Sequence, residues 1–423
     1  MFLKNRKLQI AFVLFLILGS FFYWKIDFSF YFMDEWDLID EYINKGLVGI
    51  FIPNNEHLNF VYKFLFFLNL KVFGLNVMYF RYLILLTHAL NAVFFAYLIY
   101  ILLKNNWLAL WGGIFFLFHP LHFESMLYQG GTSVTLVVAA TLLSLILLDK
   151  FISSRNYKLY YLALLCALVQ PYLLGVGLIL PVVSMTFIVL SKDKARWRLC
   201  IPFLIVFLCN GLIYKLLVPG KEISFDLIAI IRYYLTAILY HPARSLLLID
   251  RPGFWLSTIF FSMFLGLSIY FFLRGNSQKR KVILLSWIYF LLSFVLMALT
   301  RFEIGPFQSF SYRYSYYYLI PLILLGLLFI KEILKLSKIN FYPFLSLLII
   351  PFTIICFLRV GSIKTAQTQL YLSSYREILK FKEDPNYQAD LSKLNPTRDP
   401  QEILRNFIYL SEHSLVPYKK TWR

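Results

Sequence analysis

The sequence predicts an all-α protein that crosses a membrane many times, and three observations support this fold class. Hydrophobic residues occupy 60% of the 423 positions, whereas charged residues occupy only 15%. Soluble domains are about half apolar and about a quarter charged. Long apolar runs separated by short basic clusters recur along the chain, as in proteins with many transmembrane helices. An ordinary soluble protein is therefore excluded.

About eleven apolar runs are candidates for transmembrane spans. The first, 8–24, follows three basic residues and lacks a small-residue cleavage site, so we expect a retained anchor with its N-terminus in the cytoplasm. Residues 159–190 are divided near Pro171, because proline interrupts a helix. The other expected spans are 79–103, 107–120, 132–148, 159–172, 174–190, 199–218, 254–273, 282–300, 314–330 and 341–358.

The basic residues predict the orientation of these spans. On the expected cytoplasmic side, 18 Lys and Arg occur in 46 residues, compared with 10 in 115 residues on the outer side. Cytoplasmic loops are enriched in Lys and Arg, so this bias accounts for the net charge of +19 through membrane topology and not through nucleic-acid binding. The expected cytoplasmic segments are 1–7, 104–106, 149–158, 191–198, 274–281 and 331–340.

The first outer segment, 25–78, is expected to contain two helices that lie on the membrane surface. From Asp34 onward, apolar residues recur at helical spacing, and Glu41 and Lys45 stand one turn apart, where they can pair. The stretch 58–73 is apolar, but as a helix it rises only about 24 Å, less than the hydrocarbon core of about 30 Å. We therefore expect a second interfacial helix there.

The acidic residues place the polar chemistry on the outer side. Twelve of the 22 Asp and Glu lie in outer segments, and none lies in an expected span, which argues against an ion-coupled transporter. Asp34 and Glu35 are adjacent carboxylates just after the first span, and such a carboxylate can act as a general base. The alternative is structural: Asp34 caps the helix and its neighbours form a solvated face.

Further candidate residues lie at the outer ends of later spans. His119, His122 and Glu124 could ligate a divalent metal, contact a sugar hydroxyl or hold a loop by hydrogen bonds. Arg313 stands at the level of lipid phosphates, where a guanidinium binds an anion well, and Arg301 and Lys63 provide weaker versions of the same site. The competing explanation for each cation is an ion pair with an outer acid. The neighbouring tyrosines, Tyr314 among them, are typical of the interfacial aromatic belt.

The chain divides into a membrane domain, 1–358, and a more polar C-terminal tail, 359–423. By the parity of the spans the tail is external. Short helices are expected at 366–382 and 400–412 around a linker rich in Pro and Asp. The tail could cap the site or bind an acceptor, but a stabilising appendage is the favoured interpretation.

Several of these motifs, in this order, resemble those of the C-type membrane glycosyltransferases. That superfamily includes protein O-mannosyltransferases, lipid A aminoarabinose transferases and O-antigen glucosyltransferases. The similarity covers about 30–140 and 305–330. The residues that carry it are Asp34-Glu35, Asn55-Glu56-His57, Phe73-Gly74-Leu75-Asn76, Arg81, His88-Ala89-Leu90-Asn91, His119 to Glu124 and Arg313-Tyr314-Ser315-Tyr316.

The resemblance implies an enzyme that moves a sugar from a polyprenyl-phosphate donor to a glycolipid or protein acceptor at the outer face. Asp34 would be the base, with Glu35 beside it, and Arg313, with Lys63 or Arg301, would bind the donor phosphate. His57, Arg81, His119, His122, Glu124 and Tyr314 would contact substrate. Membrane lipids are further partners, and nucleic acid is not. No cofactor is required, although a divalent metal could be used.

A bacterial inner membrane is the expected location, with the site and the C-terminus in the periplasm. One departure concerns the donor site: where many relatives have a phosphate-binding Lys, this chain has Gln170-Pro171. The segment 228–251 has no counterpart in the resemblance. Two alternative functions are an O-antigen polymerase or ligase, which would place its main outer loop late in the chain, and a lipid-linked glycan flippase.

Overall fold

In the computed structural model, every described secondary-structure element is a helix, which confirms the all-α class. Nothing is described for the two motifs at 54–56 and 74–77, nor for most of the tail. The described residues are 6–23, 34–53, 57–73, 78–127, 130–191, 195–218, 226–336, 351–356, 358–359 and 380.

Fourteen described α-helices follow one another between Arg6 and Leu336, with short 3₁₀ helices between some of them. The first seven are α1 (Arg6–Tyr23), α2 (Asp34–Lys45), α3 (Phe60–Phe73), α4 (Met78–Leu103), α5 (Asn106–Leu117), α6 (Phe123–Leu127) and α7 (Gly131–Ser154). The others are α8 (Tyr157–Val169), α9 (Leu180–Val189), α10 (Arg196–Leu217), α11 (Leu227–Leu246), α12 (Phe254–Arg274), α13 (Ser277–Arg301) and α14 (Tyr312–Leu336). The 3₁₀ helices are η2 (Gly46–Phe51), η3 (Pro120–His122), η4 (Gln170–Tyr172), η5 (Gly175–Ile179), η6 (Phe302–Ile304) and η7 (Pro306–Phe310).

Five of the helical segments are long and apolar enough to cross a membrane, so the expected count of about eleven is not supported. These segments are Arg81–Leu103, Gly131–Ser154, Arg196–Leu217, Phe254–Arg274 and Ser277–Ile304. Three expected spans instead form α5, α8 and α9, with 12, 13 and 10 residues. At 1.5 Å per residue, helices of this length rise at most about 20 Å and cannot cross the core unaided.

The remaining expected spans have mixed outcomes. The predicted break near Pro171 is confirmed, because α8 ends at Val169 and the chain passes through η4 and η5 before α9 begins. The expected spans 8–24 and 314–330 correspond to α1 and α14, which are not among the five spanning candidates. Most of 341–358 lies outside the described residues.

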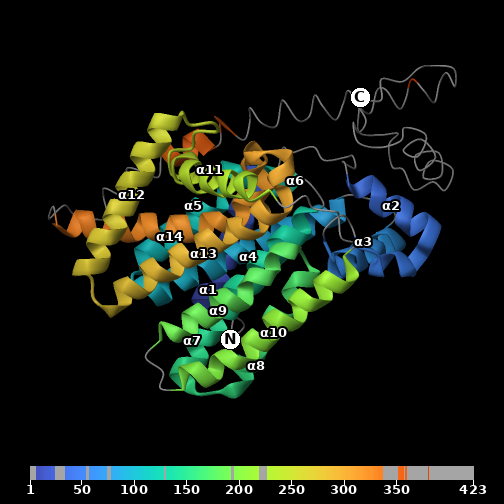
Figure 1. The fold of residues 1–423 in the computed structure, drawn as a ribbon, viewed down its shortest axis with the longest axis horizontal. Helices are drawn as coiled ribbons and strands as arrows, with labels where there is room; N and C mark the ends of the chain where they lie inside the picture. The colour runs from blue at the N-terminus through green and yellow to red at the C-terminus, as the bar shows by residue number, and fades with distance from the viewer. Residues whose placement is uncertain are drawn as a thin grey trace.

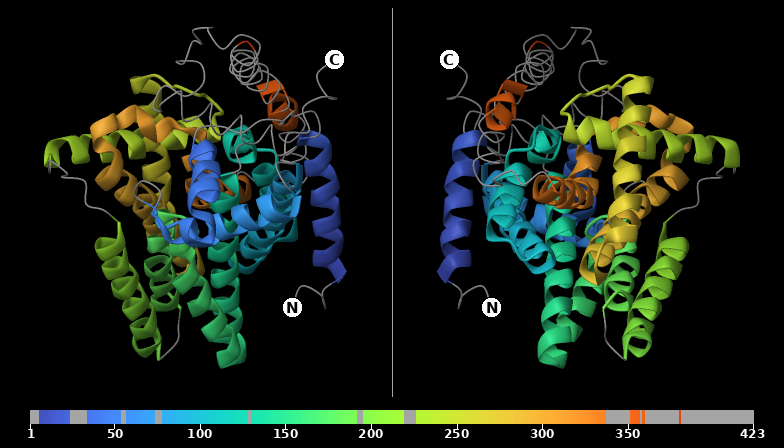
Figure 2. Two further views of the ribbon diagram at one scale, coloured as in Figure 1. Left: turned by 90° about the vertical axis from the view of Figure 1, so that its right-hand side faces the viewer. Right: turned by 90° about the vertical axis from the view of Figure 1, so that its left-hand side faces the viewer.

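The helices pack around a core that α4 organises, with α5 and α7 against it and the α13–α14 pair beside them. At one edge of the molecule, α2 and α3 form a separate projection (Figure 1). The two side views show that α1, α7 and α10 run in a similar direction, whereas α11 lies across them (Figure 2). The helix α11 is therefore oriented differently from α7 and α10, two of the helices that are long enough to span a membrane.

Helices are present at both positions expected within 25–78, as α2 and α3. The expected pairing within α2 is wrong, however. Glu41 forms its ion pair with Lys63 of α3 and not with Lys45, because α3 packs against α2 and brings a buried ammonium to the carboxylate. Among the residues of α2 whose burial is described, Leu38 and Ile39 are buried. The helices expected in the tail at 366–382 and 400–412 lie outside the described residues, apart from 380.

Candidate functional site

A pocket lies where the segment before α3 meets η5, α10, α13 and α14. Its cavity volume is about 100 Å³. Three of the residues predicted for the site line it together, although they are far apart in the sequence: His57, Arg301 and Tyr314. The rest of the lining is mostly apolar: Leu174, Gly175, Val176, Leu178, Tyr214, Leu296, Met297, Thr300 and Tyr317.

His57 is positioned in the pocket by a tyrosine and a glycine that sequence reasoning missed. The Tyr214 hydroxyl donates to the Pro171 carbonyl (2.6 Å) and accepts from the Leu58 amide (3.3 Å), so it ties the segment that carries His57 to η4. A Cβ atom on Gly175 would lie 2.9 Å from His57 Nδ1, which is closer than a carbon side chain permits. The imidazole therefore occupies space that only glycine leaves open.

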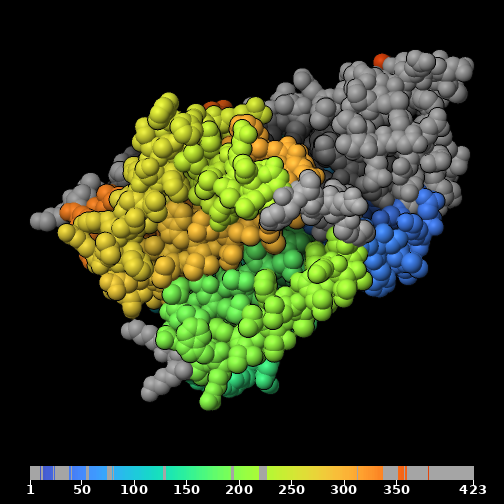
Figure 3. Space-filling view, viewed as in Figure 1, coloured from blue at the N-terminus to red at the C-terminus, as the bar shows by residue number. Residues whose placement is uncertain are grey.

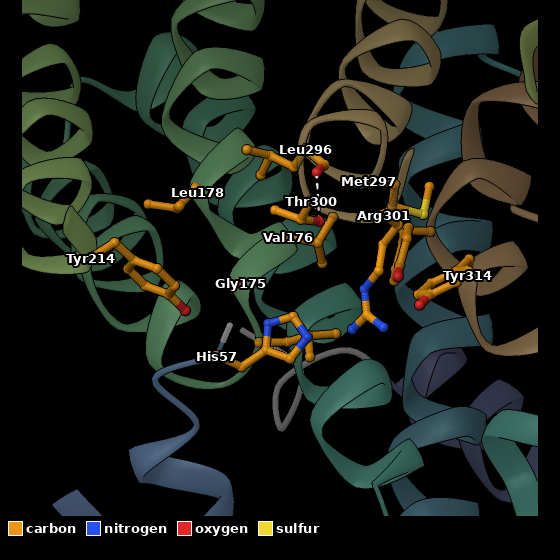
Figure 4. Close-up of a pocket in the computed structure, with 12 residues that line it drawn as sticks. His57, Gly175, Val176, Leu178, Tyr214, Leu296, Met297, Thr300, Arg301 and Tyr314 are labelled. Atoms are coloured by element: carbon orange, nitrogen blue, oxygen red, sulfur yellow. Dashed lines mark hydrogen bonds between the residues drawn. The ribbon is translucent and has the colours of Figure 1, made fainter. Parts of the chain in front are cut away.

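Arg301 supplies the positive charge of the pocket. It is in the last turn of α13, where a cation is favoured by the partial negative charge of the helix end. In Figure 4 its guanidinium and the His57 ring point into the same space, with Tyr214 and Tyr314 on opposite sides. Tyr233 of α11 also lies within the electrostatic influence of Arg301 and Tyr314. The pocket thus combines a cation, an imidazole and phenol groups on an apolar wall.

Glu124 holds the beginning of α14, and with it Arg313. Its carboxylate accepts hydrogen bonds from the Ser311 hydroxyl and the Arg313 amide, both at 3.1 Å. The Arg313 guanidinium is also near it, with Nε 3.8 Å from a carboxylate oxygen. Glu124 therefore caps the helix from another part of the chain, and Arg313 already has an acidic neighbour.

The motifs around His88 and Tyr316 meet in a buried hydrogen-bond network. His88 Nδ1 accepts from the Tyr316 hydroxyl (2.5 Å), because its Nε2–H is donated to the Leu117 carbonyl (3.0 Å). The Asn91 amide donates to the Tyr316 oxygen (3.1 Å) and to the Thr135 carbonyl (2.8 Å). This network fastens α14 to α4 and leaves His88 with both ring nitrogens in use.

His119 takes a structural position and not one in the pocket. Its Nδ1 accepts from the Leu121 amide (3.3 Å) and its Nε2–H donates to the Ser245 carbonyl (3.0 Å), so it begins η3 and contacts α11. Burial lowers the pKa of His119 to about 3, although the bond to Ser245 opposes this shift. The imidazole is therefore neutral at physiological pH.

His122 is fully buried beside His88, His119 and Tyr316. Burial is also the main cause that lowers its pKa. Among the described residues, no group of three or more His, Cys, Asp or Glu is arranged to hold a metal ion. Two of the three suggested ligands are occupied, because His119 bonds to backbone groups and Glu124 caps α14.

Lys63 is buried away from the pocket and holds α2, η2 and α3 together. Its ammonium forms an ion pair with Glu41 and donates to the Ile52 carbonyl (2.7 Å). Its side chain is fully buried, whereas that of Glu41 is 17% exposed. The contacts join α3 to α2 and η2, so Lys63 belongs to the packing of the α2–α3 projection.

The other residues predicted for the site are not among those that line the pocket. Asp34 and Glu35 are the first two residues of α2. Arg81 lies in the first turn of α4 and is 8% exposed. Gln170, which replaces the phosphate-binding lysine of the resemblance, is buried and donates to the Val137 carbonyl (2.6 Å) and the Thr141 hydroxyl. It therefore connects η4 to α7.

No family model matches the chain, and no curated protein or solved structure is detectably similar to it.

Proposed function

We propose that the protein is a membrane glycosyltransferase that moves a sugar from a polyprenyl-phosphate donor to an envelope glycolipid or protein. The observation that carries the proposal is the pocket in which His57, Arg301 and Tyr314 converge. Each comes from a segment that the sequence predicted for the site. A cation beside hydroxyl and imidazole groups on an apolar wall suits a phosphorylated amphiphile.

Arg301 is assigned to the donor phosphate, ahead of Arg313 and Lys63. Lys63 forms an ion pair with Glu41, and the Arg313 guanidinium lies near the Glu124 carboxylate. Arg301, in contrast, lines the pocket. Negative charge grows on the phosphate as its bond to the sugar breaks. A guanidinium at that oxygen therefore stabilises the transition state more than the bound donor.

Asp34 is assigned as the general base, with Glu35 as the alternative. The acceptor oxygen forms a bond to the anomeric carbon, and its proton passes to the carboxylate. The bond between that carbon and the phosphate oxygen breaks, and its electron pair leaves with the phosphate. Attack from the opposite face inverts the anomeric centre. The chemistry needs no redox partner, because the phosphate is the leaving group.

The proposal includes the location and orientation expected from the basic residues. The pocket and α2 lie on the periplasmic side of a bacterial inner membrane, and the N-terminus lies in the cytoplasm. The excess of Lys and Arg in the alternate segments supports this orientation. His57 and Tyr314 are assigned to the sugar, because imidazole and phenol groups can hydrogen-bond its hydroxyls.

The test is release of polyprenyl phosphate from a panel of polyprenyl-phosphate sugars by the purified protein, with an envelope extract as acceptor. We expect Arg301→Gln and Asp34→Asn each to lower the rate about a hundredfold or more. Arg251→Gln, which removes an exposed arginine outside the pocket, is the matched control and should retain the wild-type rate.

Other outcomes would replace the proposal. Wild-type protein that releases nothing from any donor would contradict it. Use of pyrophosphate-linked glycans alone would favour the polymerase or ligase, and movement of lipid-linked glycan without sugar transfer would favour the flippase. Full activity of Asp34→Asn, with Glu35→Gln inactive, would reassign the base.

A further inference from the structure

A second hollow lies on the far side of α11 from the pocket. It has a volume of about 590 Å³, within the range of about 300–1,000 Å³ that is typical of ligand sites. It is bounded by α11, the first residue of α12 and η7. The lining residues are Ile228, Ile231, Arg232, Leu235, Thr236, Leu239, Tyr240, Phe254, Pro306 and Phe307.

The lining is apolar apart from one charge and two hydroxyl groups. Arg232 is the charged residue of this groove, and its guanidinium is exposed. Within the described part of the chain it forms no ion pair or hydrogen bond. Leu235 lies one turn further along α11 and is 59% exposed, so an apolar wall begins beside the guanidinium. The groove therefore offers one cation at the edge of an exposed apolar surface.

The groove lies beside residues of the kind that are found at a membrane boundary. Phe254 lines it and is also the first residue of α12, one of the helices long enough to cross a bilayer. The next residue, Trp255, is 75% exposed, and tryptophan is enriched at the level of lipid headgroups. The helix α11 lies across the direction of α7 and α10, as an interfacial helix does (Figure 2).

The helix α11 separates the groove from the pocket. Its Tyr233 is fully buried and lies toward Arg301 and Tyr314, whereas the adjacent Arg232 faces the groove. Side chains of α11 and α12 form a continuous part of one surface of the molecule (Figure 3). A ligand in the groove would therefore lie on the surface of the helix bundle and not in its interior.

We propose that this groove binds a bilayer phospholipid with an anionic headgroup. The phosphate lies at Arg232, and one acyl chain lies against Ile231, Leu235 and Phe307. Charge complementarity selects the anionic headgroup, and the apolar wall selects the chain. A water-soluble peptide is a poorer occupant than a lipid, because it would not cover the apolar wall of the groove beside Trp255. The inference does not depend on the proposed transferase activity.

The experiment is native mass spectrometry of the full-length protein released from detergent after addition of phosphatidylglycerol or phosphatidylcholine. Wild type should retain phosphatidylglycerol in preference to phosphatidylcholine. Arg232→Gln should lower the retention of phosphatidylglycerol about fivefold, the effect of one interfacial arginine. Arg251→Gln removes the same charge between α11 and α12, outside the groove, and should retain the lipid as wild type does.

A second variant tests the groove with the arginine still present. Leu235→Glu places a carboxylate one helical turn from Arg232, where it pairs with the guanidinium and repels a phosphate. It should therefore lose phosphatidylglycerol as Arg232→Gln does. Because Leu235 is exposed, the fold should be retained, and the unfolding temperature checks this.

Three results would overturn the proposal. Equal losses in Arg232→Gln and Arg251→Gln would show a general surface-charge effect. Equal retention of the two lipids by wild type would show that headgroup charge is not recognised. Displacement of phosphatidylglycerol by an equal amount of polyprenyl phosphate would assign the groove to a different lipid. Sugar transfer is not measured, so these results are independent of the transferase test.

Discussion

The Tyr316 hydroxyl of α14 joins His88 and Asn91 of α4 in one hydrogen-bond network. It donates to His88 Nδ1 at 2.5 Å and accepts from the Asn91 amide at 3.1 Å. All three residues are fully buried. The network therefore holds the beginning of α14, which contributes Tyr314 and Tyr317 to the pocket, against the central helix.

Tyr316→Phe should lower the free energy of unfolding by about 1–3 kcal/mol, because it leaves His88 Nδ1 without its buried donor. Thermal unfolding in detergent measures the change. Tyr82→Phe is the matched control, since Tyr82 is on the same helix as His88 and is 60% exposed. Equal stability of Tyr316→Phe and wild type would mean that the network contributes nothing net.

Glu124→Ala should destabilise the protein by about 1–2 kcal/mol, because the first turn of α14 loses its cap. Arg313→Gln should cost less than about 1 kcal/mol, since the ion pair is long and partly exposed. Chemical unfolding of both variants compares the two contributions. If Arg313→Gln cost as much as Glu124→Ala, the ion pair and not the cap would be the main contact.

Gly175→Ala should lower the rate of sugar transfer at least tenfold with little change in stability. The added methyl group would lie 2.9 Å from His57 Nδ1, so the imidazole must move in the pocket. Gly211→Ala in α10 is the matched control, because nothing lies within 4 Å of its added Cβ atom. A helical alanine there should be neutral or stabilising. Similar rates for the two variants would contradict a role for the His57 position.

Lys63→Met should destabilise the α2–α3 projection by about 3 kcal/mol, because it leaves the Glu41 carboxylate without its buried partner. Hydrogen exchange of residues 34–73 measures this loss. Adding Glu41→Leu to Lys63→Met should recover part of it, since no unpaired charge then remains. If Lys63→Met instead raised the KM for the donor and left hydrogen exchange unchanged, Lys63 would bind the donor phosphate.

Acid should destabilise the protein through His119. Its pKa is about 3 in the folded chain and about 6.5 when unfolded. Between these values the unfolded chain binds more protons, so the free energy of unfolding falls as pH decreases from 6.5 toward 3. The contribution is at most about 1.4 kcal/mol per pH unit. His119→Gln should reduce the slope of unfolding free energy against pH, and an unchanged slope would contradict the buried neutral state.

Much of the fold was predictable because local composition determines it. The apolar runs predicted helices, Pro171 predicted a break between α8 and α9, and the spacing after Asp34 predicted α2. Helix length was less predictable. Hydropathy along 107–120 and 159–172 does not reveal where a helix ends, and the structure makes α5 and α8 shorter than a bilayer.

The sequence could predict which types of residue form the candidate site, but not which of them form ion pairs or hydrogen bonds with one another. Sequence reasoning selected Arg313 as the main cation for an anion on the outer side, with Arg301 and Lys63 as weaker candidates. Lys63 forms an ion pair with Glu41 only because α3 packs against α2. Arg313 contacts Glu124 only because α6 lies beside α14. Tyr214 and Gly175 carried no motif, because their role depends on distant segments that meet in space.

The sequence by itself determined that the protein is helical and apolar, and that its Lys and Arg are concentrated in alternate segments between the apolar runs. These properties depend on which residues are neighbours along the chain. The tertiary structure decided which polar groups are used in packing and which line the pocket. His119 and Glu124 form structural hydrogen bonds, whereas His57, Arg301 and Tyr314 share one cavity. The physical reason is that a hydrogen bond or ion pair acts over a few ångströms, and contacts across more than a hundred residues are set only by helix packing.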